Sequence, residues 1–168
     1  MNQLPNHYQY RAKAPSNIAL TKYWGKSDPA RQWPTNDSLS MTLRHCYTET
    51  GAQLSDQWQI DLPLAGERSR TKAQAFLQRL ADQEGFSQPL KISSRNSFPA
   101  GAGIASSASG FAALTIASLA AWTNSQDLDD LNAAGYSRAR LAALARLGSG
   151  SACRSLLPGF VRWSRGST

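Results

Sequence analysis

Residues 99–109 read Pro99-Ala100-Gly101-Ala102-Gly103-Ile104-Ala105-Ser106-Ser107-Ala108-Ser109, a glycine-rich segment that leads into a run of small residues. Glycine lets the backbone approach an anion closely and adopt positive φ angles. A helix that begins directly after such a loop points unpaired N–H groups at the same anion. No Gly-Lys-Ser/Thr follows, so the segment is not a Walker A loop. It predicts a phosphate cradle, and the alternative is a plain strand-to-helix turn built from small residues.

The pattern around this loop predicts a strand before it, at residues 89–94, and a mostly apolar, buried helix after it, at residues 107–122. Further strands are predicted at 8–14, 39–43, 47–54, 57–62 and 160–165, and further helices at 70–84 and 137–147, with a new helix beginning at 149–151. Gly85 and Gly148 are expected to end the two helices. Strands and helices mix without strict alternation, which favours the α+β class. The last strand has no following partner, which indicates a single domain over residues 1–168 that is truncated before a second one.

A second candidate cradle lies at residues 148–155, Gly148-Ser149-Gly150-Ser151-Ala152-Cys153-Arg154-Ser155. Ser149 or Ser151 can cap a helix N-terminus. Arg154 would then lie about one turn into that helix, near its positive end, where a planar guanidinium can bind a carboxylate or phosphate through two bonds. The alternative is a capped helix that carries a surface arginine.

A third segment, Asn17-Ile18-Ala19-Leu20-Thr21-Lys22-Tyr23-Trp24-Gly25-Lys26, places two lysines on either side of an aromatic pair. In isolation this arrangement is typical of an exposed helix or loop.

The composition excludes several classes of protein. Hydrophobic residues make up 41% and charged residues 17%, as in an ordinary globular domain. The spacing of the two cysteines and two histidines matches neither a disulfide framework nor a metal site; these residues are Cys46, Cys153, His7 and His45. The polar N-terminus lacks a signal peptide, and the longest apolar run is shorter than the roughly 20 residues that span a bilayer. We therefore expect a soluble cytoplasmic protein with no metal site of its own and no membrane partner.

The net charge of +7 predicts a polyanionic partner, either nucleic acid or a phosphorylated metabolite. The basic residues are spread along the chain, whereas a nucleic-acid footprint gathers them on one face or arm. The aromatic residues also show no base-stacking motif. A nucleic-acid-binding module is therefore an alternative function, and a solvated basic surface is the simplest explanation of the charge.

Together the three segments resemble the diphosphomevalonate decarboxylases. Residues 14–19 and 22–26 resemble the opening of that family, and Pro34-Thr35-Asn36-Asp37-Ser38-Leu39-Ser40 resembles the segment that follows. The glycine-rich loop is similar to the ATP loop of the wider superfamily of galactose, homoserine, mevalonate and phosphomevalonate kinases. Ser151-Ala152-Cys153-Arg154 is similar to the decarboxylase branch in particular. The resemblance covers residues 13–163 and indicates the N-terminal half of the family.

The resemblance implies an α+β fold like domain 2 of ribosomal protein S5, with a left-handed crossover, and a homodimer for the whole enzyme. It implies that ATP, with Mg²⁺, phosphorylates the 3-hydroxyl of mevalonate 5-diphosphate. Phosphate and carbon dioxide then leave to give isopentenyl diphosphate. Phosphoryl transfer of this kind depends on positioning and charge neutralisation.

The resemblance also assigns roles to residues. The implied catalytic residues are Arg154, which holds the carboxylate, Lys22, near the reacting hydroxyl, and Ser106, at the transferred phosphoryl group or its magnesium. The implied substrate-binding residues are Asn17, Tyr23, Trp24, Gly25, Lys26, Arg70, Ser149, Gly150, Ser151, Ala152, Cys153 and Arg154. The implied ATP-binding residues are Pro99, Ala100, Gly101, Ala102, Gly103, Ile104, Ala105, Ser106, Ser107 and Ser109.

The chain departs from the family at two points. Leu157-Pro158-Gly159 stands where the family has a stretch like Phe-Gly-Gly, and the proline is expected to end the preceding helix. The family's catalytic aspartate belongs to the second half, so no residue here takes that role and the chain is expected to be inactive alone. A sister decarboxylase or 3-kinase acting on mevalonate or its monophosphate would share most of the motifs. An inert truncated product is a further alternative.

Overall fold

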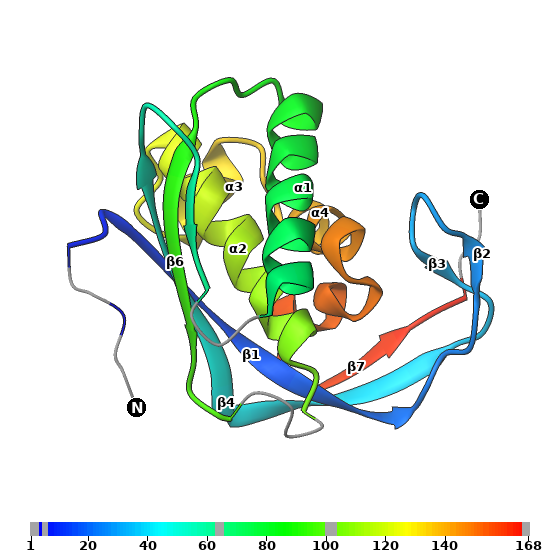
Figure 1. Cartoon of the computed structure of the whole chain (residues 1–168). Coiled ribbons are helices and arrows are strands. Elements are labelled where there is room, and N and C mark those ends of the chain that lie inside the picture. Colours follow the sequence, from blue (N-terminus) through cyan, green and yellow to red (C-terminus); the bar gives the residue numbers. More distant parts are fainter. Residues whose placement is uncertain (1–3, 5–6, 63–65, 100–103, 166–168) are drawn as a thin grey trace.

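A computed structural model describes Leu4 and residues 7–62, 66–99 and 104–165. In this part of the chain a sheet is covered on one face by helices (Figure 1). Strands β1 (Tyr10–Thr21), β4 (Ser38–Leu54), β6 (Leu90–Asn96) and β5 (Gln59–Asp61) lie side by side in that order. Strand β7 (Phe160–Trp163) pairs with β4, and β2 (Lys26–Asp28) forms a separate hairpin with β3 (Trp33–Pro34).

The long strand β4 connects the two parts of the sheet. Its C-terminal half pairs with β6, and its N-terminal end pairs with β7. Residues 39–43 and 47–54, predicted as two strands, therefore belong to one. The prediction was wrong because residues 44–46 form a bulge opposite the shift between Pro15 and Ser16 in β1, and a bulge bends a strand without ending it. The last strand has no partner after it among the described residues, as expected, but β7 pairs with the earlier strand β4 along its whole length.

The helices are α1 (Glu67–Glu84), α2 (Ser106–Thr123), α3 (Leu128–Ala133) and α4 (Arg138–Gly148), followed by the 3-10 helix η1 (Gly150–Leu156). The predicted helices at 70–84, 107–122 and 137–147 are confirmed. Gly85 ends α1 in the left-handed conformation, with φ 77°, as predicted. Ser137 caps α4 by accepting a hydrogen bond from the Arg140 amide. None of the described helices is long and apolar enough to cross a membrane.

Helix α2 lies at the centre of the molecule, between the sheet and the other helices (Figure 1). It is buried nearly all round, and Ala112, Ala113 and Ala117 are fully enclosed. Such small residues let the helix backbone approach its neighbours closely. Leu77 in α1 and Ile92 in β6 are also fully enclosed. Burial of each such side chain stabilises the fold by roughly 1.5–3 kcal/mol. The core thus fixes the N-terminus of α2 against the sheet.

Candidate functional site

The structure brings the three sequence segments together around η1. The Ser149 hydroxyl lies 3.4 Å from the Ser107 hydroxyl in the first turn of α2. Asn17 Nδ2, from β1, donates a hydrogen bond of 2.8 Å to Ser155 Oγ. Gly150 packs so closely on the loop after β1 that a Cβ there would lie 2.7 Å from the Tyr23 hydroxyl. Residues far apart in the sequence therefore share one site.

Arg154 is the buried cation of this site. Only 4% of it is exposed, and its Nη1 donates a hydrogen bond of 3.0 Å to Ser38 Oγ. Among the described residues it forms no ion pair, and its Nε is enclosed without a partner. Burial lowers the pKa of Arg154, and Cys153 and Tyr23 act in the opposite direction. Since a buried charge is costly unless it is paired, this geometry suits an anionic ligand.

The position of Arg154 within its helix differs from the prediction. Arg154 was expected about one turn into a helix, near the positive end. It lies instead in the last turn of η1, where the helix dipole is negative. Ser149 does occupy the N-cap position, but its hydroxyl caps nothing and approaches the hydroxyls of Ser107 and Ser151. The charge of Arg154, and not a helix dipole, therefore favours an anion here.

The loop that carries Lys22 and Trp24 is held through its backbone. The Trp24 amide donates to Asn36 Oδ1 at 2.9 Å, and Asn36 Nδ2 donates to the Lys22 carbonyl at 3.2 Å. The Thr35 hydroxyl donates to the Trp24 carbonyl, and Gly25 adopts φ 80°. The segment is not the helix that its composition allowed: β1 extends to Thr21, and residues 22–25 form the exposed loop that was the other possibility. The backbone anchoring leaves the side chains of Lys22 and Trp24 exposed.

The first turn of α2 has unpaired donors, as the glycine-rich motif predicted. Ala105 occupies the N-cap position, provides no side-chain cap, and no acidic residue lies in the first turn. Ser106 and Ser107 begin the helix there, while Ala100, Gly101, Ala102 and Gly103 lie outside the described residues. That undescribed segment is preceded by Pro99 and followed by Ile104 and Ala105.

The side chain of Ser109 is turned into the core. Its hydroxyl is fully buried and forms a hydrogen bond of 2.6 Å with Thr48 Oγ1 in β4. The Ser109 hydroxyl therefore faces β4, and the expected contact of Ser109 with ATP stays a prediction.

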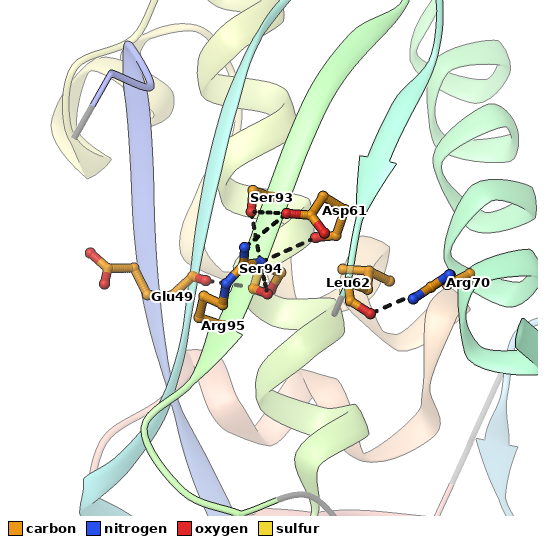
Figure 2. A network of polar contacts seen from close by, with 7 residues as sticks. All are labelled: Glu49, Asp61, Leu62, Arg70, Ser93, Ser94 and Arg95. Carbon is orange, nitrogen blue, oxygen red and sulfur yellow. Dashed lines mark hydrogen bonds and ion pairs between the residues drawn. The ribbon is translucent and has the colours of Figure 1, made fainter. Parts of the chain in front are cut away.

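Arg70 points away from the other site residues. Its Nε donates a hydrogen bond of 3.5 Å to the Leu62 carbonyl, beside the network in which Arg95 binds Asp61 (Figure 2). Asp61 has a pKa below its usual range, chiefly through the hydrogen bond from Arg95, and Arg70 contributes only a weak charge effect. The structure therefore does not bring Arg70 to Arg154.

Lys72, two positions further along α1, is the basic residue that the sequence reasoning missed. Its Nζ lies 5.1 Å from the Phe111 ring centroid, and that ring packs on Gly148. Burial lowers the pKa of Lys72, and the charges of Lys26 and Arg68 lower it further. The apolar pattern of α1 could have indicated this position. Lys72 directly precedes the buried Ala73 and lies one turn before the buried Phe76, so it borders the buried face of the helix.

Cys153, predicted as a substrate-binding residue, has a side chain turned inward. Its Sγ donates to the Gly150 carbonyl at 3.2 Å, and burial raises the pKa of the thiol to about 11. Any contact with a ligand would come from its backbone.

We expect Ellman's reagent at pH 8 to modify Cys46 in the native chain and to leave Cys153 unmodified. The thiolate is the reactive form, and a buried thiol with so high a pKa supplies almost none of it at pH 8. In denaturant both thiols should react. A Cys46→Ser variant that still reacts rapidly while folded would contradict this expectation.

The geometry defines a class of protein. An α+β domain that gathers a buried arginine, an exposed lysine on α1, serine hydroxyls and an uncapped helix N-terminus has the set of donors typical of a phosphate-binding domain. The described residues contain no group of His, Cys, Asp or Glu side chains able to hold a metal ion.

Comparison with known proteins gives the family. Residues 14–168 match the model of the diphosphomevalonate decarboxylase-like N-terminal domain, and the chain belongs to this family. It is 44% identical to the diphosphomevalonate decarboxylase of Ganoderma lucidum, an alignment that covers 95% of this chain and 42% of that protein. It is 38% identical to the diphosphomevalonate decarboxylase of Saccharomyces cerevisiae, in an alignment that covers 95% of this chain and 42% of that protein.

Solved structures show the same fold. Mevalonate diphosphate decarboxylase from Staphylococcus aureus has a TM-score of 0.80 at 38% identity, covering 95% of this chain and 46% of that one. The structure of MDDEF in complex with MVAPP, AMPPCP and magnesium has a TM-score of 0.77 at 38% identity, covering 95% and 47%. The expected α+β fold of the kinase superfamily is thereby confirmed. The chain spans somewhat less than half the length of these relatives.

Proposed function

We propose that this chain provides the ATP- and substrate-binding part of an ATP-dependent diphosphomevalonate decarboxylase. The substrate would be mevalonate 5-diphosphate and the product isopentenyl diphosphate. The observation that carries the proposal is the buried Arg154, which has no acidic partner in the described part of the chain and lies where the three family segments meet. The relatives named diphosphomevalonate decarboxylase support it.

The cations of the site are suited to the two anionic ends of this substrate. Arg154 would bind the carboxylate and hold it for loss as carbon dioxide. Lys22, Lys26 and Lys72 would neutralise phosphate oxygens, and the Tyr23 hydroxyl would donate to one of them. The position of Tyr23 supports this role, because its hydroxyl lies against Gly150 of η1 while its own loop carries Lys22.

The nucleotide phosphates would lie over the first turn of α2. The uncapped N–H groups there and the hydroxyls of Ser106, Ser107 and Ser149 form a set of donors and oxygen ligands. Mg²⁺ prefers oxygen ligands and often takes them from substrate phosphates, so serine hydroxyls fit it without a carboxylate cluster. Bound Mg²⁺ would neutralise the phosphate charge. The proximity of Ser107 and Ser149 would place the phosphoryl group beside the segment that ends in Arg154.

We further propose that the protein acts in the cytoplasm on small molecules only, and that the whole enzyme is a homodimer. Apolar side chains support contact with another protein domain, since Ile18, Leu20 and Phe160 are 40%, 54% and 68% exposed. These three side chains come from β1 and β7, at the part of the sheet away from β6.

Binding measurements with an Arg154→Lys variant test the proposal. We expect calorimetric titration with mevalonate 5-diphosphate to show at least about tenfold weaker binding than in the wild type, because lysine cannot provide the paired donors of a guanidinium. Arg140→Lys is the matched control, since Arg140 is half-exposed and pairs with Glu84 on the far helix face. Its affinity should be unchanged. Equal affinities of all three proteins would refute the proposed role of Arg154.

A further inference from the structure

Ser38 and Trp163 form a pair across two strands directly beneath Arg154. Ser38 begins β4 and Trp163 ends β7, and the two residues stand opposite each other in the antiparallel register. Both are buried, at 2% and 9% exposure. Their side chains therefore leave the sheet on the same face, toward η1.

Each member of the pair contacts a different part of the Arg154 guanidinium. Ser38 Oγ accepts the hydrogen bond from Nη1 at 3.0 Å. The Trp163 ring centroid lies 6.0 Å from Cζ, within the range of a cation–π interaction. Ser38 thus holds one edge of the planar group and Trp163 contacts its face, which together fix both its position and its tilt.

The neighbours of the pair hold it in register. Asp37, which precedes Ser38, accepts hydrogen bonds from Arg162 Nε at 2.9 Å and from the Arg165 amide at 2.6 Å. These bonds keep the pKa of Asp37 below its usual range, the Arg165 amide contributing most. The Tyr23 ring meets Trp163 edge-on, with centroids 4.8 Å apart and an interplanar angle of 72°. The start of β4 and the end of β7 therefore cannot slip past each other without breaking these contacts.

The orientation decides which nitrogen atoms a ligand can use. Nη1 is occupied by Ser38 and Nε is enclosed, whereas Nη2 makes no hydrogen bond to the described residues and is not among the enclosed atoms. Nη2 is therefore the guanidinium nitrogen that remains for a charge-assisted bond to a carboxylate. A free arginine side chain loses rotamer entropy on binding, and a preoriented one loses less.

We propose that Ser38 and Trp163 are positioning residues that orient Arg154 so that its Nη2 is presented to the substrate carboxylate. The inference rests on the proposed function, and it assigns the pair to carboxylate recognition and not to binding of the diphosphate.

The test compares two ligands, mevalonate 5-diphosphate and inorganic pyrophosphate, which lacks the carboxylate. Calorimetry on the 168-residue chain gives the ratio of their dissociation constants, and a merely structural role would change both constants together and leave this ratio unmoved. We expect Ser38→Ala to reduce the preference for the carboxylate-bearing ligand about fivefold and Trp163→Leu about tenfold. Ser38→Thr, which keeps the hydroxyl, should restore the wild-type ratio.

Two matched controls remove a serine hydroxyl and an indole ring at places in the fold away from Arg154. Ser93→Ala deletes a buried serine hydroxyl that accepts a hydrogen bond of 2.8 Å from Arg95 Nη1, in the network of Figure 2. Trp122→Leu deletes an indole that stacks on Phe86. Both controls should keep the wild-type ratio.

The outcomes separate the inference from the function on which it rests. If Arg154→Lys loses the preference while Ser38→Ala and Trp163→Leu keep it, the positioning role is overturned and the proposed function stands. If Arg154→Lys keeps the preference, or the wild type binds neither ligand, both are overturned. Should Trp163→Leu fail to fold, the ratio for Ser38→Ala decides the matter alone.

Discussion

Replacing Gly148 by alanine should destabilise the native chain by roughly 3 kcal/mol, the upper end of the cost of overpacking a filled core. A Cβ at this position would lie 2.7 Å from Cγ of Phe111, well inside van der Waals contact. The ring cannot move aside easily, because Phe76 packs against it with centroids 5.0 Å apart at an angle of 86°. The fall in the denaturant midpoint, measured by circular dichroism, gives the change in stability.

Gly110→Ala is the matched control for this substitution. Gly110 lies inside α2, and a Cβ there would meet no atom within 4 Å. Alanine in a helix interior is favoured over glycine by roughly 0.5–1 kcal/mol, so the control should be as stable as the wild type or slightly more stable. If Gly148→Ala proves as stable as Gly110→Ala, the packing of Phe111 on α4 is looser than these distances indicate.

Gly148 also shows where sequence reasoning finds the correct residue without the physical reason for it. It was expected to stop the helix, as Gly85 was expected to end α1, and Gly85 does so with φ 77°. In the structure Gly148 is the last residue of α4 and has no positive φ angle. It must be glycine because the Phe111 ring leaves no room for a side chain. That reason involves a residue far away in the sequence, so no local pattern reveals it.

The helices were predictable because their signals are local. Apolar spacing in α1, small apolar residues in α2 and the Ser137 cap of α4 are all visible in the sequence. Helix α3 carries such a signal as well, since Asp127 caps it by accepting bonds from the amides of Asp129 and Asp130. At six residues it is too short for a periodic apolar pattern to show. The bulge at residues 44–46 depends on pairing with β1 and could not be found locally.

The site was only partly predictable for the same reason. The motifs name Tyr23, Ser149 and Arg154, and the structure brings these residues together. Which face of α1 turns toward them depends on how α1 packs, and Lys72 lies on that face while Arg70 does not. Electrostatics adds a second property that no motif states, namely that no carboxylate of the described residues is among the charges that act on Arg154 and Lys72.

This lack of carboxylates leads to the prediction with the largest effect. We expect the 168-residue chain to bind mevalonate 5-diphosphate but to release carbon dioxide at a rate at least about 10²–10⁴-fold below that of a complete enzyme, the usual contribution of a positioned acid or base. The charges felt by Arg154 are those of Cys153 and Tyr23, and those felt by Lys72 belong to Lys26 and Arg68. No described carboxylate is among the charges that act on these two cations, and none is assigned to orient the substrate hydroxyl for phosphoryl transfer.

The measurement is ATP-dependent release of carbon dioxide from carboxyl-labelled mevalonate 5-diphosphate, with binding followed in parallel by calorimetry. The control is a fusion that appends the remaining half of the Saccharomyces cerevisiae relative, of which the present chain matches 42%. We expect the fusion to release carbon dioxide and its Arg154→Lys variant to release much less. That result would show that the substrate site of this chain is competent once the fused half supplies the missing catalytic group. Turnover of about 1 s⁻¹ by the 168-residue chain alone, a normal enzymatic rate, would mean that its own residues supply the missing base. The carboxylate-free electrostatics described around Arg154 would then not be those of the active state.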